Sequence, residues 1–211
     1  MNVEVSGMAE VRKEYLDNIQ NMDSSDLKNP LVFVIDMING FVKEGALADS
    51  RIMNIVPDIQ MLLEKVEARV FICDSHPEDA REFVSYPTHC LIGSKESEVI
   101  DELKGYINGK VVLKNSTNAF FAPVMQDILK NDLDRYQDMV LVGCCSDICV
   151  LTFALCLNTY FNEHQMVDKR IIVPINMIET YGIEGVHDHI KWNEVACDIM
   201  ASNGIQVVNV K

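Results

Sequence analysis

Residues 31–36 read LVFVID, a run of five apolar residues that ends in an aspartate. Val32, Phe33, Val34 and Ile35 are residue types that favour strands. The run has no alternation of apolar and polar side chains, which indicates a strand covered on both of its faces. The stretch therefore predicts a buried strand in a sheet that helices cover on both sides.

The same pattern recurs along the rest of the chain. Further short apolar runs lie at Val70–Cys73, Val111–Leu113, Met139–Val142, Ile171–Val173 and Gln206–Val210. Helical patterns separate the runs, at Ile52–Glu67, Glu96–Leu103, Ala122–Leu129, Ile148–Asn162 and Asp188–Ala201. Alternating strands and helices predict an α/β fold with a parallel sheet.

The organisation of the chain is simple. We find no internal repeat and no linker-like stretch, so residues 31–211 are expected to form one domain. Residues 1–30 are expected to form a helical extension, because Met8–Met22 carries apolar residues at helical spacing.

The composition excludes several classes of partner. The 211 residues include 32 acidic and 18 basic side chains, a formal net charge of −14. Such a charge argues against binding to nucleic acid or to an anionic membrane. Met1–Glu10 does not resemble a secretory signal, no apolar run reaches the ~20 residues of a membrane span, and the seven cysteines are scattered. We therefore expect a cytoplasmic protein with reduced thiols.

Chemically active side chains follow the predicted strands. Asp36 ends the first run, Asp74 and His76 follow the second, Lys114 follows the third, and Cys149 lies shortly after the fourth. Active sites of parallel α/β folds collect at the carboxyl ends of the strands. We therefore expect these side chains to meet at one edge of the sheet.

Their types are those of a thiol-dependent hydrolase. Cys149 is placed to be a nucleophile at the start of a helix, where the helix dipole and Lys114 would favour the thiolate. Asp36 could take the thiol proton and pass it to a leaving group. Each residue alone has a structural explanation: an inert buried cysteine, a surface lysine, a turn aspartate. The coincidence of all three favours catalysis.

A second group of residues has the composition of a metal site. Asp74 and His76 are followed by Glu82 and His89, and carboxylates and imidazoles suit zinc, iron or manganese. The alternative is that they are ordinary polar loop residues. The spacing alone leaves both interpretations open.

Two segments resemble a known family. Residues 34–41 read VIDMINGF and residues 141–150 read LVGCCSDICV. They are similar to the aspartate and nucleophile motifs of the isochorismatase-like cysteine hydrolases, and most similar to the nicotinamidase/pyrazinamidase branch. The resemblance covers about residue 31 to the end of the chain. It implies a three-layer α/β/α fold with a six-stranded parallel sheet, and catalytic roles for Asp36, Lys114 and Cys149.

The resemblance also implies details of the site. It implies a cis peptide between Cys144 and Cys145, with the backbone N–H groups of Cys145 and Cys149 forming an oxyanion hole. In the nicotinamidase branch, motifs equivalent to Asp74-x-His76 and Pro87-x-His89 bind a metal. Glu82 lies where some members supply a further ligand, directly or through water. That metal, zinc first and iron or manganese as alternatives, would take the ring nitrogen of the substrate.

The substrate pocket is the least defined part of this prediction. Phe41 and Tyr86 are expected as walls for a flat ring, although simple core packing would explain them equally well. Close relatives tend to have an aromatic residue where this chain has Thr117, and Asn118 and Phe120 could compensate. His164, His187 and His189 are expected at the surface, and Asp147 is expected to shape the turn before the nucleophile.

The sequence thus favours a small-molecule amide, nicotinamide or pyrazinamide, as the partner. Another amide, an N-carbamoyl compound and isochorismate are alternative substrates. A catalytically silent metal- or partner-binding protein is the alternative of another class. The leading segment and the sheet edges also offer surfaces for a homo-oligomer.

Overall fold

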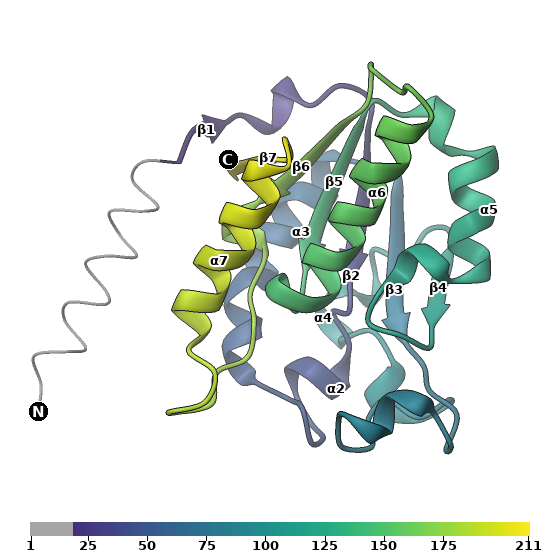
Figure 1. The fold of residues 1–211 in the computed structure, drawn as a ribbon, viewed down its shortest axis with the longest axis vertical. Coiled ribbons are helices and arrows are strands. Elements are labelled where there is room, and N and C mark those ends of the chain that lie inside the picture. Colours follow the sequence, from purple (N-terminus) through teal and green to yellow (C-terminus); the bar gives the residue numbers. More distant parts are fainter. Residues whose placement is uncertain (1–18) are drawn as a thin grey trace, which may run out of the picture.

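A computed structural model describes residues 19–211 and contains one parallel sheet (Figure 1). The strand order is β1-β7-β6-β5-β2-β3-β4. The strands are β1 (Asn21–Met22), β2 (Pro30–Ile35), β3 (Arg69–Asp74), β4 (Val111–Lys114), β5 (Asp138–Gly143), β6 (Arg170–Pro174) and β7 (Gln206–Val210). The predicted α/β class is confirmed, and all six expected runs are strands.

Helices cover both faces of the sheet, giving the predicted three layers (Figure 1). One face packs against α5 (Pro123–Asn131), α6 (Leu151–Glu163) and α7 (His189–Ser202). The other packs against α2 (Asn39–Val42), α3 (Val56–Lys65) and α4 (Asp101–Lys104).

The central strand β2 explains why its sequence is continuously apolar. Phe33 and Ile35 belong to the cluster beneath α6, where the Phe33 ring lies 5.3 Å from that of Phe153. Val32 and Val34 belong to the cluster on the opposite face. Because every side chain of the strand faces a helical layer, each contributes roughly 1.5–3 kcal/mol of burial.

The seventh strand differs from the expectation. The helix predicted for Met8–Met22 lies mostly outside the described residues, but Asn21–Met22 is a strand. It pairs with Asn209–Val210 at the edge of β7. The Lys211 N–H donates a hydrogen bond to the Met22 carbonyl at 3.0 Å. An edge strand offers unpaired backbone groups, and pairing with them outweighed the weak helical pattern.

Three predicted helices are shorter than expected. In place of Ile52–Glu67 the structure has a 3-10 helix at Ser50–Ile55 followed by α3. In place of Glu96–Leu103 the structure has a 3-10 turn at Lys95–Ser97 followed by α4. Between them Val99 forms an antiparallel bridge with Ile38, which requires extended backbone. At the fourth strand end, α6 begins at Leu151 rather than Ile148, and a turn of π-helix at Ser146–Val150 precedes it.

No helix within residues 19–211 is both long and apolar enough to cross a membrane.

Candidate active site

The strand order brings the predicted residues to one edge of the sheet. β2 lies between β5 and β3, and β4 follows β3, so the carboxyl ends of four neighbouring strands meet. The chain leaves β2 at Asp36 with a left-handed backbone, φ 51°, which aspartate tolerates better than most residues. The Asp36 N–H donates to the Ile72 carbonyl at 2.9 Å, which ties this turn to β3.

Lys114 is the centre of the first group of side chains. Its Nζ lies 2.8 Å from Asp36 Oδ2, contacts Asp74 Oδ1, and lies 3.8 Å from Cys149 Sγ. Asp36 Oδ1 accepts a hydrogen bond from the Asp74 N–H at 3.0 Å. All four residues are buried, so the structure brings together the three residues assigned to catalysis and adds Asp74 to them.

The charges in this group are strongly coupled. Burial opposes the charge on Lys114, but the Asp36 and Asp74 carboxylates raise its pKa well above the ordinary value, so it is an ammonium. Burial raises the pKa of Asp36 to about 7, against the opposing effect of Lys114. Burial also disfavours the charge on Asp74, yet Lys114 and His76 hold its pKa below the usual range. Asp74 is thus the permanent counter-ion and Asp36 the group that can exchange a proton.

The nucleophile turn is built by close backbone contacts. Gly143 has φ 114°, and a Cβ at this position would collide with the Ile35 carbonyl oxygen. The Cys144–Cys145 peptide is cis, as the resemblance implied. The Ile148 and Val150 N–H groups both donate to the Cys145 carbonyl at 3.1 Å, which closes the turn around Cys149.

Burial opposes the thiolate form of Cys149, which the helix dipole and Lys114 were expected to favour. Burial raises the pKa of the Cys149 thiol well above its ordinary range, and the opposing effect of Lys114 is smaller. Cys149 also lies in the π-turn, before the regular helix that was expected to stabilise a thiolate. A reaction at this thiol would have to remove its proton, and the Asp36 carboxylate contacts the same Lys114 ammonium as the sulfur does.

The predicted metal ligands form the second group. One ligand atom from each of Asp74, His76, Glu82 and His89 lies within 4.8 Å of all the others. His89 Nε2 is 3.9 Å from Asp74 Oδ2 and 3.9 Å from Glu82 Oε1, and His76 Nε2 is 3.6 Å from Asp74 Oδ1.

The orientation of the imidazoles fits a metal ion. His76 Nδ1 is 2.8 Å from Asn115 Oδ1, and His89 Nδ1 is 2.8 Å from the Pro87 carbonyl oxygen. Both partners accept, so both Nδ1 atoms carry the proton and each Nε2 presents a lone pair, as in ligating histidines. Among the described residues, the buried His76 Nε2 has no hydrogen-bond partner. An unpaired buried nitrogen is costly, and a divalent ion would satisfy it.

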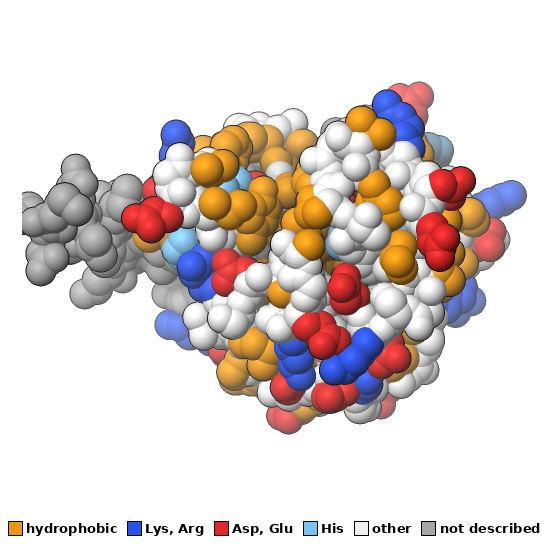
Figure 2. Space-filling model, turned by 90° about the horizontal axis from the view of Figure 1, so that it is seen from below, with side chains coloured by type: hydrophobic (Ala, Val, Ile, Leu, Met, Phe, Trp, Pro, Cys, Tyr) orange, Lys and Arg blue, Asp and Glu red, His pale blue; other side chains and the backbone are white. Residues whose placement is uncertain are grey.

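A cavity of about 360 Å³ connects the two groups. Cys149 lines it from the first group, next to Cys145 of the same turn. Asp74, Glu82 and His89 line it from the second group. Figure 2 looks onto this side of the molecule and shows hydrophobic side chains around its hollow. The predicted pocket residues that line it are Phe41, Tyr86 and Thr117.

Phe120 does not line this cavity. Its ring packs against Tyr160, with centroids 5.8 Å apart, and against the core beneath α6. Phe120 follows Asn118, whose side chain caps the turn by accepting from the Phe120 N–H at 2.9 Å. The cap turns the ring toward α6, so Phe120 cannot compensate for Thr117.

Sequence reasoning missed the part of the cavity that comes from loops. Asp49 and Ile148 line it, as do Tyr181, Gly182 and Ile183 from the segment between β6 and α7. His187, expected at the surface, is buried, and its Nε2 lies 2.9 Å from Asp147 Oδ2. The rule that led to Asp36 and Lys114 also applies to the end of β6, and it would have pointed to this segment.

The parallel three-layer fold thus carries a thiol, a carboxylate and an ammonium side by side at its strand ends. The chain belongs to the isochorismatase domain family, whose model matches residues 30–159.

Three proteins of known or assigned activity are similar to this chain. Nicotinamidase 1 of Arabidopsis thaliana is 27% identical over 164 residues, which cover 65% of this chain and 67% of the plant protein. The N-carbamoylsarcosine amidase of Thermoplasma acidophilum has a TM-score of 0.65 and 25% identity, covering 86% of this chain and 96% of that one. A pyrazinamidase of Pyrococcus horikoshii, solved in complex with zinc, has a TM-score of 0.67 and 20% identity, covering 86% and 99%. This protein is therefore a hydrolase of that family.

Proposed function

We propose that this protein hydrolyses a small neutral aromatic amide, nicotinamide or a close analogue such as pyrazinamide, to the acid and ammonia. Cys149 is the nucleophile, Asp36 moves the proton, and Lys114 holds the charges in place. The observation that carries the proposal is that the Lys114 group and the Asp74–His89 group open into one cavity. A thiol can then reach the carbonyl of a molecule whose ring lies at the second group.

The charge of the cavity favours a neutral substrate. Asp49, Asp74 and Glu82 line it, and no lysine or arginine does so among the residues that the structure describes. Recognition of a carboxylate usually needs a guanidinium or ammonium partner. Isochorismate and N-carbamoylsarcosine both carry carboxylates, so they fit this cavity less well than nicotinamide. The same charge would favour release of the carboxylate product.

The first half of the reaction forms a thioester. Asp36 takes the proton of the Cys149 thiol, and the sulfur attacks the carbonyl carbon. The oxyanion that develops is stabilised by the backbone N–H groups of Cys145 and Cys149, which typically contribute about 10²–10³-fold each. Asp36 then gives its proton to the amide nitrogen, the C–N bond breaks, and ammonia leaves. A pKa of about 7 suits Asp36 to both transfers.

The second half returns the enzyme to its starting state. Asp36 removes a proton from a water molecule, and the resulting hydroxide attacks the thioester carbonyl. The C–S bond breaks, and Cys149 regains its proton as the carboxylic acid leaves. Throughout the cycle Lys114 stays charged, because Asp74 provides a constant counter-ion.

Asp74, His76 and His89 would hold a divalent metal ion, with Glu82 as a further ligand directly or through water. Zinc is the first candidate, and iron or manganese suits the same donors. When bound, the ion supplies an electron-pair acceptor for a ring nitrogen and so orients the substrate. The Asn115 and Pro87 oxygens would keep the two imidazoles in the ligating orientation.

A reducing cellular compartment is part of the proposal. All seven cysteines lie in the described part of the chain, and no disulfide links them. This supports the expectation of a reducing compartment such as the cytoplasm.

Ammonia release tests the proposal. The metal-loaded protein should release ammonia from nicotinamide and pyrazinamide, with kcat/KM at least about tenfold higher than for benzamide, which lacks the ring nitrogen but keeps the shape. N-carbamoylsarcosine and acetamide should be poorer still. A preference for N-carbamoylsarcosine would replace the aromatic amide by another amidase substrate. No hydrolysis of any amide by a folded, metal-loaded protein would favour the silent binding protein instead.

A further inference from the structure

One wall of the cavity is formed by the segment between β6 and α7. Tyr181, Gly182 and Ile183 line the cavity, whereas the neighbouring residues hold this segment in place. Ile183 and His187 form an antiparallel bridge in which each N–H donates to the other's carbonyl, at 2.9 and 2.8 Å. The segment is therefore a closed loop that carries Tyr181 at its start.

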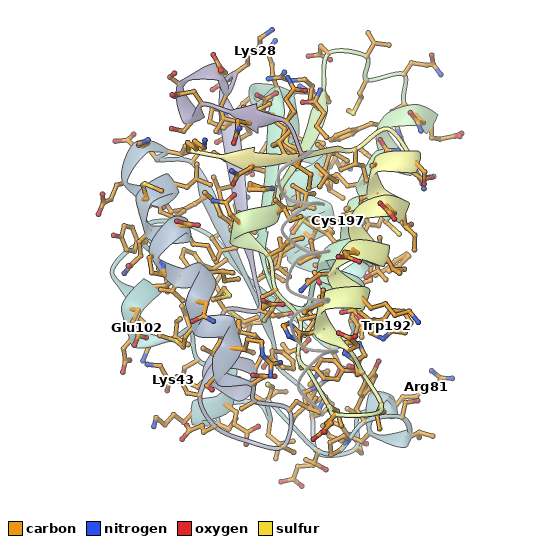
Figure 3. The ribbon with its side chains drawn as sticks, turned by 90° about the vertical axis from the view of Figure 1, so that its left-hand side faces the viewer. Lys28, Lys43, Arg81, Glu102, Trp192 and Cys197 are labelled. Carbon is orange, nitrogen blue, oxygen red and sulfur yellow. The ribbon has the colours of Figure 1, made fainter. Side chains whose placement is uncertain are left out.

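His187 is the central residue of this loop. Its ring stacks on the Tyr181 ring with centroids 4.0 Å apart and an interplanar angle of 14°. The Trp192 ring stacks on its other side, at 5.3 Å and 5°. His187 Nδ1 also lies 2.8 Å from the Tyr181 carbonyl oxygen. Both the ring and the backbone of Tyr181 are thus held by one histidine. Trp192 lies in the first turn of α7 (Figure 3).

Asp147 joins this loop to the nucleophile turn. One of its oxygens lies 2.9 Å from His187 Nε2, and the other accepts a hydrogen bond from the Thr180 hydroxyl at 2.6 Å. Asp147 precedes Cys149 by two residues in the same π-turn, and its side chain is 7% exposed. The carboxylate therefore links the turn that carries the thiol to the part of the wall that faces it.

A second carboxylate fixes the far end of the wall. Asp49 Oδ2 accepts a hydrogen bond from the Gly182 N–H at 2.9 Å and lies 2.9 Å from Arg51 Nη1. The wall is thus attached on both sides. Backbone hydrogen bonds of Glu179 with Gly143 and Ser146, at 3.2 and 3.0 Å, join the start of this segment to the nucleophile turn, and the Asp147 side chain joins the part next to Tyr181.

We infer that Asp147 and His187 are positioning residues that hold the Tyr181 wall against the Cys149 turn and thereby limit the size of the group that reaches the thiol. Neither residue has to touch the reacting atoms. As far as it concerns an amide substrate, this inference rests on the proposed function. The restriction of access to Cys149 follows from the geometry alone and does not depend on the substrate.

The test uses alkylation of Cys149, which needs no amidase activity. The thiol displaces iodide from a haloacetamide: an S–C bond forms, the C–I bond breaks, and the thiol proton passes to the buffer. Rates are compared for iodoacetamide and the bulkier N-benzyl iodoacetamide on the full chain. Peptide mass spectrometry assigns the label to Cys149 rather than Cys145. The measured quantity is the ratio of the bulky to the small reagent's rate.

Removal of the histidine should open the wall. In His187→Ala we expect this ratio to rise about tenfold or more, because Tyr181 loses its stacking partner and its backbone acceptor loses its donor. His187→Phe keeps the stacking and loses both hydrogen bonds, so a smaller rise is expected. If His187→Ala does not fold, His187→Phe decides the question by the same ratio.

The carboxylate allows a rescue comparison. Asp147→Ala should raise the ratio, whereas Asp147→Asn should stay near the parent value, because the amide can accept from Thr180 and donate to His187 Nε2. Where an aromatic amide is turned over, Asp147→Ala should raise KM more than it lowers kcat. A general loss of stability would not produce this pattern.

His164 provides a matched control. Its ring also lies against a tyrosine ring, that of Tyr160, with centroids 4.1 Å apart and an interplanar angle of 33°, and its Nδ1 lies 2.9 Å from the carbonyl oxygen of that tyrosine, but neither residue lines the cavity. His164→Ala should leave the ratio unchanged. An unchanged ratio in folded His187→Ala or His187→Phe, or an equal rise in His164→Ala, would overturn the inference. If no amide is hydrolysed but the alkylation ratio still rises in the His187 variants, the proposed substrate is overturned and the positioning role of Asp147 and His187 is not.

Discussion

The two groups at the strand ends differ in how their charges are balanced. In the first, the Lys114 ammonium lies between two carboxylates, and every charge has a partner inside the protein. In the second, two imidazoles and Glu82 face Asp74, and among residues 19–211 the His76 Nε2 has no hydrogen-bond partner. The first group is complete without a ligand, whereas the second is suited to a cation. Asp74 belongs to both.

This difference separates two roles. A balanced, buried group can move a proton without importing a charge, which suits bond breaking. A cluster of lone pairs can hold a cation, which suits substrate orientation. Changes in the first group should therefore reduce kcat, and changes in the second should raise KM.

The largest effect is expected at the nucleophile. Cys149→Ala should lower amide hydrolysis by about 10⁴-fold or more, because it removes the thiol that lies against Lys114. Metal content, measured by mass spectrometry of the dialysed protein, should not change. Cys156→Ala, on α6 and away from the cavity, should keep its activity. Substantial hydrolysis in Cys149→Ala would mean that both groups act without the thiol.

Lys114 should be as important for folding as for catalysis. Lys114→Met leaves the buried Asp36 and Asp74 carboxylates without their cation and should lower the free energy of unfolding by about 3–5 kcal/mol. Lys110 is the matched control. Its ion pair with Asp132 is half exposed, so Lys110→Met should cost less than about 1 kcal/mol in the same urea titration. Equal costs for the two variants would show that the first group is not a coupled, buried unit.

The second group should respond to loss of a single ligand. His89→Ala should weaken metal binding by about 10²-fold, and Asn115→Leu, which only releases His76, by about 10–100-fold. Both are measured by metal titration. Removal of the metal with a chelator should raise KM for nicotinamide while iodoacetamide still labels Cys149. A chelated protein with an unchanged KM would refute the division of roles.

The smallest effect concerns the dependence of stability on pH. The pKa of Asp36 is raised by burial to about 7, against an unfolded value near 4. Between these values the folded protein binds a proton that the unfolded chain does not, so this group's stabilisation is present at low pH and is lost as pH rises through 7. The slope is at most about 1.4 kcal/mol per pH unit. Asp36→Asn should abolish this contribution.

Unfolding in urea at pH 5 and pH 7.5 measures this slope. The parent protein should lose more stability between the two values than Asp36→Asn does. Hydrolysis should rise over the same range, because the base has to be unprotonated. Identical slopes in both proteins would show that a group other than Asp36 causes the pH dependence of stability.

The sequence was most informative where chemistry follows a strand. Runs of apolar residues identified six of the seven strands, and the residues after them led to Asp36, Asp74, Lys114 and Cys149. Parallel topology makes such an inference reliable, because all carboxyl ends meet at one edge.

The remaining features depend on contacts that no local pattern records. β1 exists because β7 has a free edge, and the Phe120 ring turns away because Asn118 caps its turn. The Tyr181 wall depends on side-chain pairs 33 and 40 residues apart, Asp147 with Thr180 and with His187. Burial raises the pKa of the Cys149 thiol, whereas the sequence pointed only to the helix dipole and Lys114, which favour the thiolate.

The most direct test of the central claim is a crystal structure of the metal-loaded Cys149→Ala protein with nicotinamide, including anomalous scattering at the metal edge. We predict an ion between Asp74, His76 and His89, the ring nitrogen beside it, and the carbonyl carbon about 3–3.5 Å from the position of the missing sulfur. An amide bound with its carbonyl directed away from residue 149, or an ion bound at other residues, would contradict the claim that the two groups act on one substrate.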